Sequence, residues 1–370
     1  MFYVGSGERE KVMKTYLVGG AVRDKLLGLK VKERDFVVVG STVQDMLHAN
    51  FKKIGGTFPV FLHPETKEEY ALARTEKKQG EGHTGFICDF SPETSLEEDL
   101  TRRDLSINAI AMDESGGLID PNNGRKDLER RYLKHISGSF SEDPLRILRV
   151  ARFLAQLHEF DFSVHPDTHQ LILKMMEEQV LLQISPERIL QEIDKALSTK
   201  APSRFFSYLD EIRASNLLWP GIKVDTSEKI DLMRQEDVES KLCATLAGLD
   251  EQDTRYFCER VNLENRRRDL VVLVNNEIEF WKNFHRHSAK EVVNFLERTD
   301  AFRKKDRFIK FNRVCESLTK RKLGQKWLSL YEMAQSVQLK SGDREKLKGP
   351  DFGKALKNKR IAEINRKNDL

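Results

Sequence analysis

Residues 16–40 constrain the fold more than any other stretch, because strand and helix signals alternate there around a pair of glycines. The apolar triplet Tyr16-Leu17-Val18 predicts a short strand, and Gly19-Gly20 lets the backbone turn tightly and approach a ligand closely. Residues 21–27 have the apolar spacing of a helix, and residues 36–39 form an apolar run typical of a buried strand. The stretch therefore predicts a strand–turn–helix–strand unit.

Two acidic residues, Glu33 and Asp35, stand just before the second strand. Side chains alternate along a strand, so residues 33 and 35 are expected to point to the same side. Two adjacent carboxylates repel each other unless a cation joins them, and a glycine turn at a helix start favours phosphate oxygens. The stretch predicts a site for a Mg²⁺-nucleotide; the alternative is a solvated acidic loop.

Two further apolar runs, residues 60–62 and 69–73, predict a β-hairpin around a turn at residues 63–66. Glu69 opens the second run and is the candidate for a third carboxylate, although its spacing equally fits an exposed strand residue. Residues 75–90 follow, with three glycines and mixed charges, and predict a mobile loop. In a nucleotide enzyme such a loop could close over substrate; the alternative is an ordinary surface loop.

Arginines are concentrated in two later segments. Arg102 and Arg103 interrupt a helical pattern, and the fixed donor fork of a guanidinium suits a triphosphate. Asn108, among apolar neighbours, is expected to hydrogen-bond a sugar or the backbone. A helix with acids and proline at its start begins near Glu142 and carries a stripe of arginines that suggests phosphate or base contact, namely Arg146, Arg149 and Arg152.

The start of this helix also carries Asp143, on the same face as Arg146. The two side chains together offer acceptors and donors that match the Watson–Crick edge of a base. A surface ion pair between them is the alternative interpretation.

The second half of the chain reads as all-helical: no strand is predicted after about residue 140, and a domain boundary is predicted near residues 220–226. Residues 301–370 carry a net charge of +12, whereas the whole chain carries +4. This basic region is either a solubilising tail or a surface for nucleic-acid phosphates. The four cysteines are far apart, which argues against a zinc site and fits a reducing cytoplasm. No run of 18 apolar residues predicts a membrane span, and no signal peptide is evident.

The chain contains six motifs, given below in sequence order, that resemble those of bacterial class II tRNA nucleotidyltransferases, the CCA-adding enzymes of the polymerase-β-like superfamily. The resemblance is close over roughly residues 14–220, and the phrase V-K-E-R-D-F-V-V-V-G-S-T is most similar to the gammaproteobacterial branch. The motifs are L-V-G-G-A-V-R-D (17–24), E-R-D (33–35), R-R-D-L-S-I-N-A (102–109), D-P-N-N-G (120–124), E-D-P-L-R-I-L-R-V-A-R-F (142–153) and P-E-R-I-L-Q-E (186–192).

The resemblance implies an α+β nucleotidyltransferase head with a mixed β-sheet, followed by an all-α neck, body and tail. Its expected bounds are a flexible extension (1–13), the head (14–137), the neck (138–220), the body (221–300) and the basic tail (301–370). It implies stepwise addition of C, C and A to the 3′ end of tRNA from CTP and ATP, without a nucleic-acid template. The implied partners are tRNA, CTP and ATP, with no membrane, and a monomer is the default expectation.

The resemblance also implies roles for individual residues. Glu33 and Asp35 would hold Mg²⁺, and Glu69 would help to activate the attacking 3′-hydroxyl. The expected nucleotide-binding residues are Gly20 and Arg23 at the triphosphate, Arg103 at the ribose or phosphate, Asp143 and Arg146 as the amino-acid template for C or A, and Arg149 and Arg152. Loop 75–90 corresponds to the flexible loop that the family needs for the switch to A.

Two features depart from the family pattern. Glu33 stands where the family typically has Asp, so the first metal ligand is one methylene longer. No His-Asp dipeptide occurs anywhere, so we expect no phosphohydrolase activity of the kind that some relatives carry. A bacterial poly(A) polymerase, a relative that adds only CC or only A, and a non-catalytic tRNA-binding relative remain alternatives.

Overall fold

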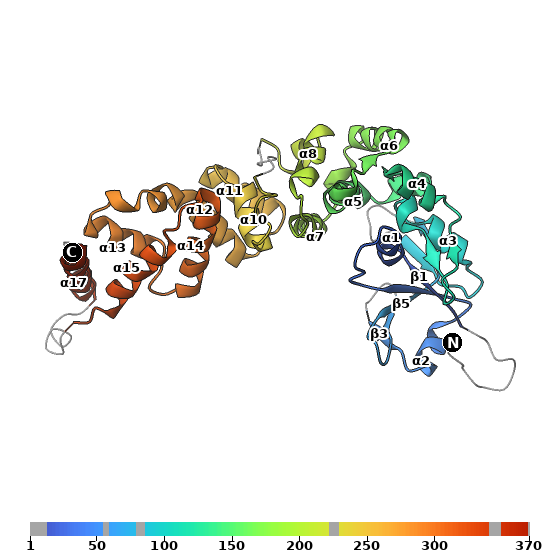
Figure 1. Cartoon of the computed structure of the whole chain (residues 1–370), viewed down its shortest axis with the longest axis horizontal. Coiled ribbons are helices and arrows are strands. Elements are labelled where there is room, and N and C mark those ends of the chain that lie inside the picture. The colour runs from blue at the N-terminus through green and yellow to red at the C-terminus, as the bar shows by residue number, and fades with distance from the viewer. Residues whose placement is uncertain (1–12, 55–58, 79–85, 222–228, 340–348, 369–370) are drawn as a thin grey trace. The chain divides into compact units, whose positions relative to one another are not determined.

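The structure is a computed structural model, and it describes residues 13–54, 59–78, 86–221, 229–339 and 349–368 (Figure 1). The chain divides into two compact units. The first comprises Met1–Ala196 and Ser207–Leu218, and the second comprises Leu197–Phe206 and Trp219–Leu370. The finer division into head, neck, body and tail stays a prediction.

A mixed seven-stranded sheet with the order β3-β4-β5-β2-β1-β8-β9 lies in the first unit. Within this sheet β2 and β5 pair in parallel, and the other neighbours pair antiparallel. The parallel pair lies at the centre, so residues from two distant parts of the sequence become neighbours there. The strands are β1 (Lys14–Val18), β2 (Asp35–Val39), β3 (Lys52–Ile54), β4 (Val60–Leu62), β5 (Glu69–Leu72), β8 (Ala111–Met112) and β9 (Leu118–Ile119).

The predicted first strand, helix, second strand and hairpin are confirmed. The helix is α1 (Gly20–Leu26), and β4 and β5 form the hairpin. The loop prediction was wrong at the two ends of residues 75–90, because β6 (Thr75–Lys78) and β7 (Phe86–Asp89) pair as a separate antiparallel ladder. Charged residues with low strand propensity hid β6 from sequence reasoning. Residues 79–85 of the predicted loop lie outside the described part of the chain.

The two faces of β2 pack into different apolar clusters. Val38 lies in a cluster with Met46 of α2 (Val43–His48). The same cluster includes Met13, which was predicted to belong to a flexible extension. Residues 1–12 of that extension lie outside the described residues. Val37 lies on the other face, in a cluster with Leu100 of α3 (Leu96–Thr101). The strand is therefore buried on both sides, and it fixes the position of Asp35 at its first residue.

The turn Ser106–Asn108 and helix α4 (Gly124–Arg130) pack closely against each other. A Cβ added at Gly124 would lie 2.2 Å from the carbonyl oxygen of Ser106. The carboxylate of Asp120 accepts hydrogen bonds from the backbone N–H groups of Gly124 and Arg125, at 2.7 and 2.9 Å. The D-P-N-N-G motif is thus explained by close packing and helix capping.

The rest of the first unit is mainly helical. One expectation was wrong: β11 (Ser163–Val164) follows residue 140 and pairs in parallel with β10 (Tyr132–Leu133). The helix predicted from Glu142 begins at Leu145, because Pro144 is the N-cap and the preceding residues form a 3₁₀ turn. The helices are α5 (Leu145–Gln156), α6 (Pro166–Glu177), α7 (Pro186–Leu197), α8 (Ser203–Glu211, divided between the units) and α9 (Ser215–Leu218).

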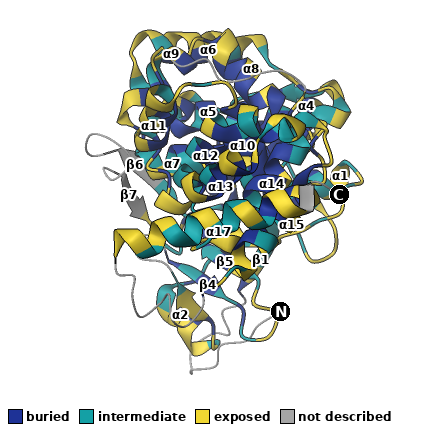
Figure 2. Cartoon of the chain, turned by 90° about the vertical axis from the view of Figure 1, so that its left-hand side faces the viewer, coloured by how far each residue is buried: buried dark blue, intermediate teal, exposed yellow. Residues whose placement is uncertain are grey.

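The described part of the second unit is helical. Trp281 and Trp327 are fully buried in it, and the indole N–H of Trp281 donates to Oδ1 of Asn312 at 2.8 Å. Figure 2 shows exposed residues along α17. None of the described helices is both long and apolar enough to cross a membrane. The helices are α10 (Val238–Thr245), α11 (Glu251–Arg260), α12 (Asn265–Lys282), α13 (Ala289–Arg298), α14 (Lys305–Thr319), α15 (Gly324–Ser336) and α17 (Pro350–Asn368).

Candidate active site

The glycine turn between β1 and α1 brings two arginines to one place. Gly19 has a φ of +70°, which L side chains rarely adopt, and a Cβ here would lie 3.2 Å from Nη1 of Arg103. The buried Arg23 donates through Nε and Nη2 to Oδ1 of Asp24, at 2.9 and 2.7 Å. Its Nη1 donates to Oδ1 of Asn108 at 2.8 Å. Asn108 was predicted to bind a sugar or the backbone; here it positions Arg23.

At the central strands, Glu69 and Glu33 act on a third carboxylate, that of Asp35. Asp35 and Glu69 are direct partners across the parallel pair β2–β5. The pKa of Asp35 is raised, first by partial desolvation of its carboxyl, then by the charge of Glu69 and to a smaller extent by that of Glu33, while Arg103 lowers it. Glu33 precedes β2, so the strand alternation assumed from the sequence does not apply to it. In the described residues no group of three or more His, Cys, Asp or Glu is arranged to hold a metal ion.

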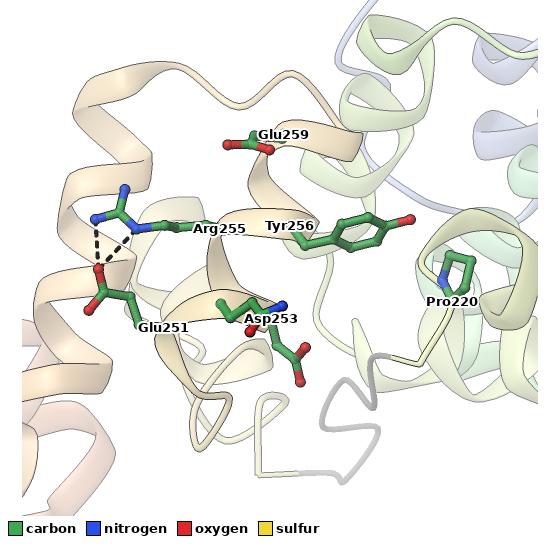
Figure 3. Close-up of a pocket in the computed structure, with 7 residues that line it drawn as sticks. Pro220, Glu251, Asp253, Arg255, Tyr256 and Glu259 are labelled. Carbon is green, nitrogen blue, oxygen red and sulfur yellow. Dashed lines mark hydrogen bonds and ion pairs between the residues drawn. The ribbon is translucent and has the colours of Figure 1, made fainter.

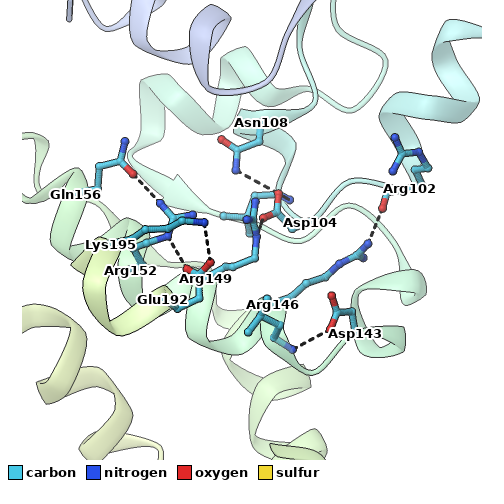
Figure 4. Close-up of polar contacts among 12 residues, drawn as sticks. Arg102, Asp104, Asn108, Asp143, Arg146, Arg149, Arg152, Gln156, Glu192 and Lys195 are labelled. Atoms are coloured by element: carbon cyan, nitrogen blue, oxygen red, sulfur yellow. Dashed lines mark hydrogen bonds and ion pairs between the residues drawn. The ribbon is translucent and has the colours of Figure 1, made fainter. Parts of the chain in front are cut away.

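Asp143 and Arg146 have separate partners. The carboxylate of Asp143 accepts two hydrogen bonds from the guanidinium of Arg188, at 3.2 and 2.8 Å. Arg146 donates through Nη1 to the carbonyl of Ser139 at 2.9 Å and through Nη2 to the carbonyl of Arg102 at 2.7 Å (Figure 4). The alternative of an ion pair between Asp143 and Arg146 is therefore not what the described contacts show.

The other two arginines of α5 are held by buried carboxylates. Arg149 donates through Nε to Oδ2 of Asp104 at 2.7 Å, and Arg152 through Nε to Oε2 of Glu192 at 2.6 Å (Figure 4). Burial raises the pKa of Asp104, but the charge of Arg149 and its hydrogen bond outweigh this effect, and the pKa lies well below its usual range. Both carboxylates therefore fix the guanidinium groups that they bind.

A cavity of about 750 Å³ in the first unit brings these residues together. Ten basic and five acidic side chains line it, so it attracts a polyanion such as a triphosphate. Nine of the ten residues predicted from the sequence line it: Gly20, Arg23, Glu33, Asp35, Arg103, Asp143, Arg146, Arg149 and Arg152. Glu69 lies outside the lining and acts on the cavity through its neighbour Asp35.

Sequence reasoning gave no role to the residues that hold the arginines in place. Arg188 and Glu192 belong to the quoted motif P-E-R-I-L-Q-E, yet their partners are 45 and 40 residues away in the sequence. Asp104 is the acid of the quoted motif R-R-D, whereas Asp99 lies outside the quoted motifs and only the structure shows that it is buried. The charged residue types were visible in the sequence, but which acid binds which arginine depends on how the chain folds.

A second hollow, of about 650 Å³, lies in the second unit beside α11 (Figure 3). Acidic residues dominate its charged lining: Glu251, Asp253 and Glu259. Its one lining arginine, Arg255, is engaged by Glu251 at 2.8 and 3.0 Å. This hollow therefore repels a triphosphate, and the cavity of the first unit is the candidate active site.

Two family models match the chain. The Poly A polymerase head domain matches residues 15–134, and the model described as the probable RNA and SrmB-binding site of polymerase A matches residues 161–225. A curated relative, the CCA-adding enzyme of Coxiella burnetii (strain RSA 331 / Henzerling II), is 43% identical over 358 residues, which are 95% of each chain.

Solved structures show the same fold. The Bacillus stearothermophilus CCA-adding enzyme in complex with CTP is 26% identical, with a TM-score of 0.71 over 96% of this chain and 89% of that one. The Thermotoga maritima CCA-adding enzyme complexed with tRNA_CCA is 21% identical, with a TM-score of 0.65 over 94% and 86% of the two chains. With a relative this similar over nearly its whole length, the chain belongs to the family of CCA-adding enzymes.

Proposed function

We propose that this chain adds C, C and A stepwise to the 3′ end of tRNA, using CTP and ATP and releasing pyrophosphate. The observation that carries the proposal is the 750 Å³ cavity, where a carboxylate edge meets a set of fixed arginines. The chain is a nucleotidyltransferase by family. Its reaction depends mainly on positioning and on neutralising charge around the triphosphate.

Glu33 and Asp35 are the proposed ligands of Mg²⁺. The pKa of Asp35 is raised mainly because its carboxyl is partly desolvated, and the charges of Glu69 and Glu33 raise it further. A divalent cation would relieve the repulsion among these carboxylates. Mg²⁺ is commonly held by one or two carboxylates plus substrate phosphates, which fits an edge without a complete cage. When bound, the ion would supply charge neutralisation at the reacting phosphate. Glu69, beside Asp35, is proposed to help activate the attacking 3′-hydroxyl.

Arg23 and Arg103 are the proposed triphosphate ligands. Nε of Arg103 is buried and has no hydrogen-bond partner among the described residues, so this donor is open to a ligand in the cavity. Gly19 and Gly20 leave the backbone open for close approach by phosphate oxygens. Arg149 and Arg152 add positive charge to the same cavity.

Asp143 and Arg146 are the proposed readers of the base. Cytosine and adenine both present an amino donor beside a ring-nitrogen acceptor, whereas guanine and uracil present the reverse pattern. A carboxylate beside a guanidinium matches the first pattern. Arg146 has five N–H donors and uses two of them for carbonyls, which leaves donors for a base.

The decisive experiment is incorporation of labelled CTP and ATP into a tRNA that lacks its 3′ CCA, with Mg²⁺, followed at single-nucleotide resolution. Addition of C, C and A followed by a stop supports the proposal. Addition that stops after CC, or of A alone to a tRNA ending in CC, would indicate a partial enzyme. No incorporation by a protein that still binds tRNA would indicate a non-catalytic relative.

A poly(A) polymerase is the second candidate, because the family model that matches residues 15–134 is named for that enzyme. A long ladder of A without use of CTP would establish it. We also propose a cytoplasmic location, which is compatible with a tRNA substrate, and a monomer remains a prediction.

A further inference from the structure

Asp99 of α3 is a fully buried carboxylate outside the lining of the active-site cavity. Its burial raises its pKa, but Arg103 and Arg102 outweigh that effect, so the pKa lies below its ordinary value. A charged carboxylate without solvent is costly for a fold unless its oxygens are fully bonded. Asp99 therefore needs the partners that surround it, and those partners belong to the site.

The two oxygens of Asp99 bind two neighbouring arginines. Oδ1 accepts hydrogen bonds from Nε and Nη2 of Arg102, at 3.1 and 2.7 Å, and Oδ2 accepts one from Nη2 of Arg103 at 3.0 Å. Bonds between charged groups are short and directional, so one carboxylate fixes both guanidinium planes. Arg103 is thereby held with its Nη1 near Gly19 and its Nε unpaired.

Arg102 extends the connection towards the base-reading residues. Its backbone carbonyl accepts the hydrogen bond from Nη2 of Arg146 at 2.7 Å (Figure 4). Its Nε also donates to the carbonyl of Arg74 at 3.0 Å. Asp99 therefore fixes Arg102, whose backbone carbonyl is a hydrogen-bond partner of Arg146.

Arg74 extends the connection in the other direction. It lies between β5 and β6, at the base of the β6–β7 hairpin, and its backbone N–H donates to Oδ1 of Asp99 at 3.3 Å. Arg74 is therefore held to Asp99 by its N–H and to Arg102 by its carbonyl. The buried side chain of Asp99 thus connects Arg74 at the base of the hairpin, Arg103, and Arg102, whose carbonyl binds Arg146.

We propose that Asp99 is a positioning residue that couples the base of the β6–β7 hairpin to Arg103 and Arg146, and that it sets how well CTP and ATP are distinguished. The inference rests on the proposed function for its assay and goes beyond it by assigning a role to a residue that touches no nucleotide. Its loss should change both nucleotide affinity, through Arg103, and the choice of base, through Arg102 and Arg146.

The test compares Asp99→Asn with Glu97→Gln, an exposed carboxylate on the same helix. Addition of C to tRNA lacking CCA, and of A to tRNA ending in CC, gives kcat and KM for each nucleotide. We expect Asp99→Asn to raise KM by about tenfold, the equivalent of one charged hydrogen bond. We also expect it to change the ratio of kcat/KM for CTP and ATP severalfold, while Glu97→Gln changes neither quantity.

A lower melting temperature with unchanged KM and unchanged CTP/ATP ratio would show that Asp99 is structural only and would overturn the proposal. If Asp99→Asn does not fold, Arg102→Gln breaks the same connection from the other side and must change the ratio; an unchanged ratio overturns the proposal. In the double variant with Asp99→Asn and Arg102→Gln, the effects on the CTP/ATP ratio of kcat/KM should be non-additive, because both substitutions remove the same interaction.

Equilibrium binding separates this inference from the proposed function. Wild-type protein that adds C-C-A establishes the function, whatever Asp99 does. If wild-type protein adds nothing, binding of CTP and ATP is measured directly in wild type and in Asp99→Asn. Weaker binding or a changed CTP/ATP binding ratio in the variant supports the positioning role, and equal binding of both nucleotides overturns it.

Discussion

Single carboxylates determine where the guanidinium groups of the cavity lie. Asp99, Asp104 and Glu192 are buried, and each holds one or two arginines by short hydrogen bonds. Fixed donors need no reorganisation when a charged substrate arrives, which favours catalysis by electrostatic complementarity. The guanidinium groups of Arg102, Arg103, Arg149 and Arg152 are therefore oriented before substrate binds.

Glu33→Ala should lower the rate of Mg²⁺-dependent CTP incorporation by at least about 100-fold, because a ligand of the proposed ion is lost. Glu33→Asp, which restores the carboxylate usual in the family, should stay active. Initial rates over a range of Mg²⁺ concentrations measure both effects. Full activity in Glu33→Ala would refute the role assigned to Glu33.

Asp104→Asn should destabilise the protein by about 3 kcal/mol at pH 7, because it leaves Arg149 without its buried partner. The folded-state pKa of Asp104 is depressed, so its contribution is present above the unfolded value of about 3.9 and is lost as pH falls through the folded value. Urea unfolding of both proteins between pH 7 and 3 measures the difference. We expect that difference to shrink below about pH 4, and a constant difference would contradict the assignment.

The residue types of the site could be predicted from the sequence, but their partners could not. Glu33, Asp35 and the arginines of α5 carry local signals: paired acids, a spacing of three, and a proline at the helix start. The pairs Asp143–Arg188 and Arg152–Glu192 join segments 45 and 40 residues apart, and only the folded chain brings them together. For the same reason Asn108 was predicted to bind a sugar or the backbone, whereas it accepts a hydrogen bond from Arg23.

Two short elements, the turn Ser106–Asn108 and α4, support the site. The turn Ser106–Asn108 carries Asn108 into the cavity, and α4 packs against its other end through Gly124. The hydroxyl of Ser106 also donates to Oδ2 of Asp127 on α4, at 2.6 Å. The position of Asn108, and hence that of Arg23, depends on this packing.

Gly124→Ala should destabilise the protein by about 3 kcal/mol, because its methyl group would meet the Ser106 carbonyl at 2.2 Å and force the turn to move. It should also raise the KM for both nucleotides by displacing Asn108. Gly138→Ala is the matched control, since nothing lies within 4 Å of its added Cβ. Thermal melts and nucleotide titrations measure the effects; equal stability of the two variants would contradict the packing argument.

At the scale of elements, apolar strands were predictable and charged ones were not. The buried strand β2 and the β4–β5 hairpin follow from runs of valine, phenylalanine and leucine. The ladder of β6 and β7 does not, because the glutamate and two lysines of T-E-K-K have low strand propensity and hide one of its two strands. Two-residue strands such as β11 are too short to leave a periodic signal.

The whole molecule has an uneven charge, with +12 in residues 301–370 and −8 in the rest. A nucleic-acid partner releases counterions from basic surfaces, so its affinity falls with salt in proportion to the phosphates neutralised. Lys320, Arg321 and Lys322 form an exposed basic turn between α14 and α15. Substitutions in this turn test directly whether the basic region contacts tRNA.

Replacing Lys320, Arg321 and Lys322 by Ser should weaken tRNA binding and reduce the slope of log affinity against log salt by between about 2 and 3. Binding of CTP, whose proposed cavity lies in the first unit, should not change. Filter binding at several salt concentrations measures the slope. An unchanged slope would mean that this turn serves only solubility.

All three tryptophans of the chain, Trp219, Trp281 and Trp327, belong to the second unit, and all are buried. Indole fluorescence therefore reports on that unit alone, whereas far-ultraviolet circular dichroism reports on both. A chain whose units unfold independently would show two different midpoints by the two methods, and a coupled chain would show one. The three tryptophans are thus a natural optical probe of whether the first unit, which contains the candidate active-site cavity, and the second unit unfold cooperatively.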